Sequence, residues 1–118
     1  MELIPENLRL RLIENSRASQ LSIDRDGNPP DHWPVIKLFT PDAQATWLLT
    51  ELNPDCNVAF GLADFGLGCP ELGYVSLDEL SRLRGHLGLA MEVDSGFEAE
   101  FPLSDYARMA RQAGRIEA

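Results

Sequence analysis

Three carboxylates in the middle of the chain have the side-chain chemistry of a metal-dependent hydrolase. Glu51, Asp64 and Glu71 each fall at or near the end of a predicted strand, so they could converge on one divalent cation. Such a site would cleave phosphodiesters, which makes a metal-dependent nuclease or phosphodiesterase one functional alternative. It would also need Lys or Arg to hold the phosphate, and neither occurs between Leu38 and Ser81. We therefore rank this alternative second.

The cysteines and histidines form no recognisable catalytic or metal-binding motif. Cys56 and Cys69 stand thirteen positions apart, and only two histidines, His32 and His86, could complete a ligand set. Structural zinc needs four ligands, which usually come as two close pairs. We expect no bound metal or cofactor, and we interpret the cysteines as small buried or half-buried thiols.

The net charge of −9 is concentrated in the middle of the chain. Seven acidic residues and no basic residue lie between positions 38 and 81, namely Asp42, Glu51, Asp55, Asp64, Glu71, Asp78 and Glu79. This segment disfavours direct binding to nucleic acid, because phosphate contacts need Lys and Arg. Two interpretations stay open. The acidic surface either keeps the protein dissolved, or attracts a partner protein with a basic surface, with imitation of nucleic acid as a special case.

Two large aromatic residues could anchor such a partner. Trp47 and Tyr74 lie on predicted neighbouring strands, with Phe39 and Phe60 nearby. We expect Phe39 and Phe60 to face the core. An exposed Trp or Tyr often dominates a protein interface, so Trp47 and Tyr74 join the seven acidic residues as the candidate partner surface.

The elements that must position these residues are mainly strands. Segments rich in β-branched and aromatic residues alternate with turn residues, and they predict strands over 34–40, 45–52, 57–64, 71–76 and 89–94. The first four are joined by connections too short for a parallel crossover. The sequence therefore predicts an antiparallel meander of four to five strands.

Helical patterns flank the predicted sheet. The apolar stripe of Ile4, Leu8 and Leu12 predicts a helix over about 5–16, followed by a loop over 22–34. Ser76 and Glu79 form a capping box that starts a helix over about 77–84, and a last helix is expected over about 104–114. The fold class is α+β, in one domain spanning residues 1–118.

The chain lacks the sequence features of membrane insertion or export. It contains no apolar run of the ~20 residues that span a bilayer, and its first residues have neither a basic region nor an apolar signal segment. We expect a cytoplasmic protein without membrane association.

Four blocks in the middle of the chain resemble a known family. Residues 35–41, 46–51, 60–61 and 70–80 stand in the order seen in domain-of-unknown-function family 2958, and Glu-Leu-Gly-Tyr-Val-Ser-Leu at 71–77 is the most specific part. The resemblance covers roughly residues 35–94, and the chain departs from the usual pattern after Asp94. It implies a small bacterial protein, often encoded beside conjugation or phage-like genes.

These observations favour a non-enzymatic interaction or regulatory protein of a bacterial mobile element or phage, acting through an acidic, sheet-centred surface. The nuclease or phosphodiesterase remains the alternative. No pattern in the sequence sets the oligomeric state or the identity of the partner.

Overall fold

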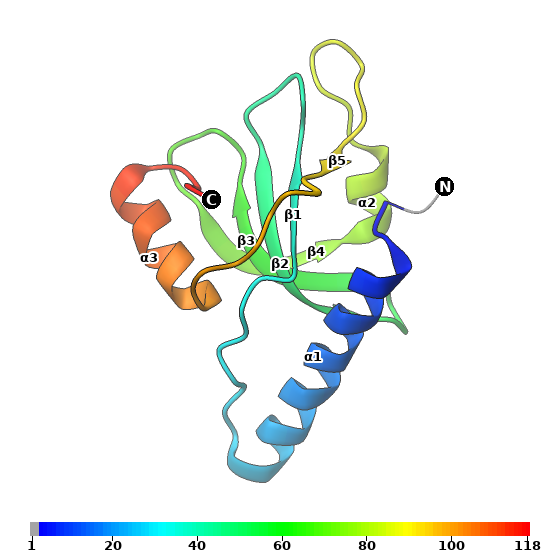
Figure 1. Ribbon diagram of the computed structural model, residues 1–118, viewed down its shortest axis with the longest axis vertical. Helices are drawn as coiled ribbons and strands as arrows, with labels where there is room; N and C mark the ends of the chain where they lie inside the picture. The colour runs from blue at the N-terminus through cyan, green and yellow to red at the C-terminus, as the bar shows by residue number, and fades with distance from the viewer. Residues whose placement is uncertain (1–2) are drawn as a thin grey trace.

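Five strands form one antiparallel sheet in the spatial order β4-β3-β2-β1-β5. Figure 1 shows the computed structural model, which describes residues 3–118. The elements are α1 (Glu6–Asp26), β1 (Ile36–Phe39), β2 (Thr46–Asn53), β3 (Val58–Asp64), β4 (Glu71–Ser76), α2 (Leu77–Arg82), β5 (Glu92–Val93) and α3 (Leu103–Ala113). The predicted α+β fold, with its antiparallel sheet and its helices at both ends of the chain, is confirmed.

The first four strands form a meander, as the short connections predicted, but the last strand does not extend it. β5 pairs with β1 at the opposite edge, where Val93 lies opposite Leu38 and Glu92 opposite Phe39. The predicted strand over 89–94 is also reduced to two residues. The strand is shorter than predicted because residues 84–90 form a separate loop, which the antiparallel pairing of Ala90 with Arg84 closes.

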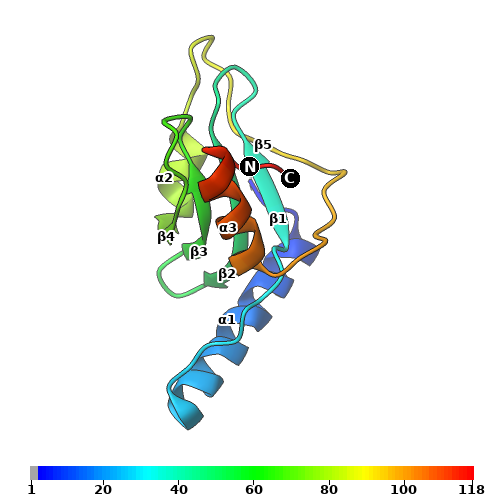
Figure 2. The same cartoon turned by 90° about the vertical axis from the view of Figure 1, so that its left-hand side faces the viewer.

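Each face of the sheet carries its own hydrophobic core, because alternate side chains of a strand point to opposite faces. On the α1 face, Trp47 and Leu49 of β2 lie in a cluster with residues of β1, α1 and α2. On the α3 face, Leu48 and Leu62 pack against Leu103, Tyr106, Ala107 and Ala110 of the last helix. Figures 1 and 2 show the resulting layers, with α3 on one side of the sheet and α2 and the first half of α1 on the other.

The first helix is longer than the sequence suggested. We predicted its end near residue 16 and a loop from Ser22, whereas α1 runs to Asp26 and ends at Gly27 in the left-handed conformation, with φ of 82°. Residues 22–26 include no Gly or Pro, so the first strong helix terminator is Gly27. The second half of α1 therefore extends past the sheet, and residues 27–35 return beside it (Figure 1). Within residues 3–118, no helix has the length and apolarity needed to cross a membrane.

Candidate binding site

A β-bulge in β2 brings α1 and the sheet into polar contact. The pairing of β2 with β3 shifts between Leu49 and Glu51, so the Thr50 carbonyl points out of the regular ladder. The side-chain amide of Asn15 donates to this carbonyl at 3.0 Å. Ser19 lies one helical turn further along α1, on the same side of the helix, and reaches the next residue of the bulge.

The Ser19 hydroxyl lies between a histidine and a carboxylate. It donates to Oε2 of Glu51 at 2.9 Å, and its oxygen lies 2.9 Å from Nε2 of His32. The hydroxyl has only one proton to donate, so with that proton directed at Glu51 the neutral tautomer of His32 that carries its hydrogen on Nε2 completes the contact by donating to the Ser19 oxygen. The chain of hydrogen bonds connects the returning segment, α1 and β2. Ser19 is 4% exposed, and its hydrogen bond holds the Glu51 carboxylate in place.

A pocket of about 320 Å³ opens beside Glu51, and we call it the bulge pocket. Residues of α1 form one wall, and Phe60 and Tyr74 form the other. These two aromatic residues are directly paired across β3 and β4, with ring centroids 5.0 Å apart. The bulge pocket therefore combines a half-buried carboxylate with an aromatic wall.

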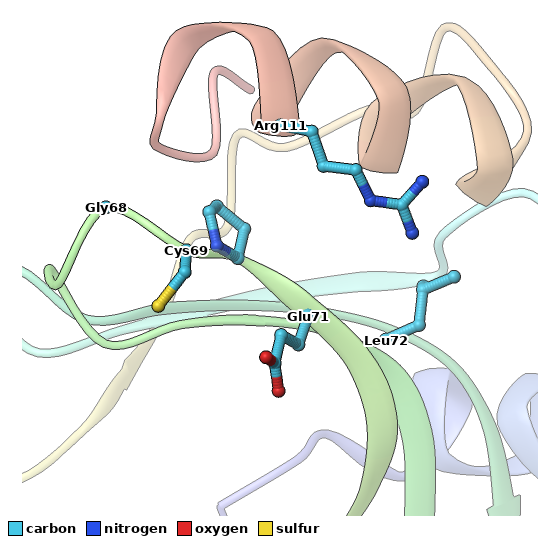
Figure 3. Close-up of a pocket in the computed structure, with 6 residues that line it drawn as sticks. Gly68, Cys69, Glu71, Leu72 and Arg111 are labelled. Atoms are coloured by element: carbon cyan, nitrogen blue, oxygen red, sulfur yellow. The ribbon is translucent and has the colours of Figure 1, made fainter.

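The strand that carries Tyr74 lies at the edge of the sheet. Within residues 3–118, β4 pairs with β3 alone, and its other side is unpaired. Tyr74 is 78% exposed on the α3 face. At the other end of β4, Arg111 extends over Leu72, whereas the Glu71 carboxylate points to the opposite side of the strand (Figure 3). The free edge thus has an acidic side chain on one face and an aromatic one on the other.

Two residues of the predicted partner surface are buried, so their assignment to that surface is wrong. Trp47 is 1% exposed, because the alternation of β2 turns it toward the α1 face with Leu49, and its ring packs edge-on against Phe65. Asp64 is 4% exposed and accepts backbone N–H groups from Gly66 at 2.8 Å and Ile116 at 2.9 Å. Asp64 fastens the C-terminal tail to the loop after β3.

Asp42 also has a structural partner. Its Oδ2 accepts the backbone N–H groups of Leu87 at 2.6 Å and Leu89 at 3.3 Å, which ties the turn after β1 to the loop of residues 84–90. Burial raises the pKa of Asp42, but these N–H groups outweigh it and hold the pKa below its ordinary value. The pocket nearby is lined by the turn after β1, by His86, and by Phe65 and Gly66 of the loop after β3.

The other four acidic residues of the predicted surface are exposed, namely Asp55, Glu71, Asp78 and Glu79. Asp78 accepts the side-chain amide of Asn57 at 3.1 Å. The N–H of Glu79 donates to the Ser76 hydroxyl at 3.2 Å, so Ser76 has the predicted capping role. Glu71 is the first residue of β4, and Asp78 and Glu79 lie in the first turn of α2 after its end, so exposed acidic side chains stand at both ends of the edge strand.

The three carboxylates of the nuclease alternative do not converge. Asp64 pairs with Thr46 and Glu51 with Phe60, so Asp64 and Glu51 lie four residues of β3 apart, or about 13 Å along the strand. Glu71 pairs with Ala63 and lies on the other face from Asp64. In the described part of the chain, no group of three or more His, Cys, Asp or Glu side chains is close enough to hold a metal ion. The nuclease or phosphodiesterase alternative required these three carboxylates to converge, and they do not.

A family model described as "Protein of unknown function (DUF2958)" matches residues 3–117. The chain belongs to this family. The match extends well beyond the 35–94 region of the resemblance, so the segment after Asp94 falls within the DUF2958 pattern. Comparisons with curated proteins and with solved structures found no match.

The polar contacts around Glu51 in this DUF2958 protein were missed from the sequence. Ser19, His32 and Glu51 are separated by 13 and 19 positions, and no spacing rule connects a helix, a loop and a bulge. The cysteines also differ from expectation, because Cys56 and Cys69 are both exposed. Each stands in a connection between strands, where the backbone turns away from the core.

Proposed function

We propose that this DUF2958 protein is a binding protein that receives an extended, basic segment of a partner protein along the free edge of β4. The observation that carries the proposal is the edge itself. It is six residues long and contains no Pro, and Glu71 at its start is its one charged residue, so the other five residues carry none of the charged or proline side chains that commonly prevent edge strands from pairing with other chains. Recognition by strand addition uses such an edge, with backbone hydrogen bonds for affinity and side chains for selectivity.

The charges around β4 favour a basic partner. Glu71 lies at the start of the strand, and Asp78 and Glu79 follow its end, with all three side chains exposed. An added strand would place its side chains alternately on both faces, so it could meet Glu71 on one face and Tyr74 on the other. Electrostatic attraction of this kind mainly accelerates association and selects among partners.

We propose that the protein regulates its partner by binding it. The family resemblance implies neighbouring genes of conjugation or phage type, and the acidic edge supports a role in holding or sequestering a basic protein of a bacterial mobile element or phage in the cytoplasm. A protein that imitates nucleic acid would also attract basic partners. However, Asp42 and Asp64 are occupied by internal hydrogen bonds, which favours an edge-strand site over an array of free carboxylates.

The test compares short synthetic peptides by two-dimensional NMR. A peptide of alternating Lys and Val should shift the amide signals of Glu71–Ser76 in a saturable way, whereas the same peptide with proline at every second Val should not, because proline cannot donate to the strand. The variant Glu71→Lys should weaken binding several-fold, and Glu92→Lys on β5 serves as the control at the other edge. Equal binding of both peptides would contradict strand addition. If the protein forms a dimer and Tyr74→Lys makes it monomeric, a second copy of the chain, and not a basic partner, occupies the edge.

A further inference from the structure

We infer that the bulge pocket receives a cationic side chain, a guanidinium or an ammonium group, between Glu51 and the Phe60–Tyr74 wall. The inference deepens the proposed function, because the cation would belong to the segment docked beside β4. The pocket itself is tested without that segment, so the two can fail separately.

The first step is the unneutralised charge of Glu51. Its side chain is half-buried, and no residue that lines the bulge pocket in the described chain is Lys or Arg. The ion pairs within residues 3–118 are Lys37 with Asp94 and Arg108 with Asp105, so neither involves Glu51. A ligand cation would therefore meet this carboxylate without competition from a cation of the protein.

The second step is the fixed orientation of this carboxylate. Ser19 holds Oε2 at 2.9 Å, and His32 holds Ser19 in turn. Within residues 3–118, Oε1 of Glu51 accepts no hydrogen bond, so it is available to a donor from a ligand. A guanidinium or ammonium N–H would form a charge-assisted hydrogen bond with it, which is stronger than a bond between neutral groups.

The third step is the aromatic wall. The faces of Phe and Tyr rings attract cations within about 6 Å of the ring centroid. The Phe60 and Tyr74 rings are inclined by 59° with centroids 5.0 Å apart, and both border the bulge pocket. A cation beside Glu51 would therefore meet a carboxylate on one side and aromatic rings on the other. Asn53 is also on the lining, but its side-chain amide oxygen already accepts the backbone N–H of Asp55 at 2.9 Å.

The fourth step is size and position. A volume of about 320 Å³ lies at the lower end of the roughly 300–1,000 Å³ range of small-molecule pockets, which suits one side chain better than a large ligand. Tyr74 belongs to both the pocket wall and the edge strand. A basic residue of a segment paired with β4 would thus stand next to the pocket opening.

The experiment uses N-acetyl-arginine methylamide as the probe and its citrulline counterpart as the neutral control of the same shape. In NMR titrations of the full chain, the arginine probe should shift the signals of Ser19, Glu51 and Tyr74 in a saturable way, and the citrulline probe should not. Glu51→Gln keeps an oxygen for Ser19 and should weaken arginine binding at least ten-fold. Tyr74→Ala, at an exposed position, should weaken it several-fold.

The matched control is Glu92→Gln, which removes the same charge at the opposite edge and should leave arginine binding unchanged. Equal shifts from arginine and citrulline would overturn the inference. So would arginine shifts that centre on Asp78 and Glu79 and persist in Glu51→Gln. If the basic peptide binds β4 while the arginine probe fails, the pocket inference alone is wrong. If arginine binds while the peptide fails, the proposed edge function is wrong.

Discussion

Replacing Ser19 by Ala removes one hydroxyl that takes part in two hydrogen bonds. Both distances are 2.9 Å, and Ser19 is 4% exposed, so water has little access to replace the hydroxyl. A hydrogen bond to a charged group contributes about 1.5–3 kcal/mol, and one between neutral groups about 1 kcal/mol. The substitution also gains about 0.5 kcal/mol of helix propensity. We expect a net loss of at least about 2 kcal/mol in the free energy of unfolding.

The control is Ser16→Ala on the same helix. Ser16 also lines the bulge pocket, but within residues 3–118 its side chain makes no hydrogen bond. The Ser16→Ala substitution gains the same helix propensity as Ser19→Ala. The difference in free energy of unfolding between the two variants therefore measures the hydrogen bonds of Ser19. A loss of about 2 kcal/mol should lower the melting temperature by about 6–12 °C in a domain of this size.

Urea unfolding followed by circular dichroism would give the free energy for each variant, and a thermal scan would give the melting temperature. The Nε2 proton of His32, observed by NMR, should lose its protection from exchange in Ser19→Ala and keep it in Ser16→Ala. If the two variants are equally stable, the hydroxyl of Ser19 does not carry the contact between α1 and the bulge, and the orientation of Glu51 must have another cause.

Two further predictions concern the backbone and the loops. Gly61 and Gly73 are paired across β3 and β4, but a Cβ on Gly61 would fall on a backbone oxygen of β2, whereas one on Gly73 meets nothing within 4 Å. Urea unfolding should therefore show a loss of about 2 kcal/mol for Gly61→Ala and a change within about 0.5 kcal/mol for Gly73→Ala. The pKa of Asp42 lies below its ordinary value of 3.8, so its stabilisation is present above that value and is lost as the pH falls through the lower pKa of the folded protein. The amide signals of Leu87 and Leu89 should follow this titration together, and amide signals that move at the ordinary pKa would contradict the geometry.

The sheet was predictable from the sequence where local signals agree with the tertiary structure. β1 to β4 are separated by clusters of turn residues, and short connections leave antiparallel pairing as the available solution. The position of β5 was not predictable in this way, because its pairing with β1 is set by the path of a long loop. The length of α1 was missed because its second half buries little. Leu21 and Ile23 are 67% and 42% exposed, so the amphipathic signal fades before the helix ends.

The candidate site was less predictable, because it depends on which face each strand residue takes. Tyr74 and Trp47 looked equivalent in the sequence, yet one is 78% and the other 1% exposed. Alternation fixes which residues share a face, but only the positions of the helices decide which of them remain uncovered. No residue pattern predicts the bulge at Thr50, although the bulge directs Glu51 toward Ser19.

The acidic segment of the chain consists of two groups with different roles, and their separation leads to the last prediction. Asp64 is buried and accepts two backbone N–H groups, whereas Glu71 and Glu79 are exposed, and their carboxylates take part in no ion pair within residues 3–118. Asp64→Ala should remove both hydrogen bonds, and because Gly66 is exposed and Ile116 half-buried, we expect a loss in the free energy of unfolding near the lower end of the about 1–3 kcal/mol that each fully buried N–H group would cost.

The double variant Glu71→Gln/Glu79→Gln should instead change the free energy of unfolding by less than about 0.5 kcal/mol per site, because exposed substitutions remove only surface repulsion. Its effect should appear in binding. With the basic Lys–Val peptide, stopped-flow association should slow several-fold and lose much of its salt dependence, while dissociation changes less. The matched control Glu92→Gln/Glu117→Gln removes the same charge elsewhere on the surface and should leave the rate nearly unchanged. If both double variants slow association equally, the attraction comes from the net charge of the molecule, and the β4 edge has no special role in steering the partner.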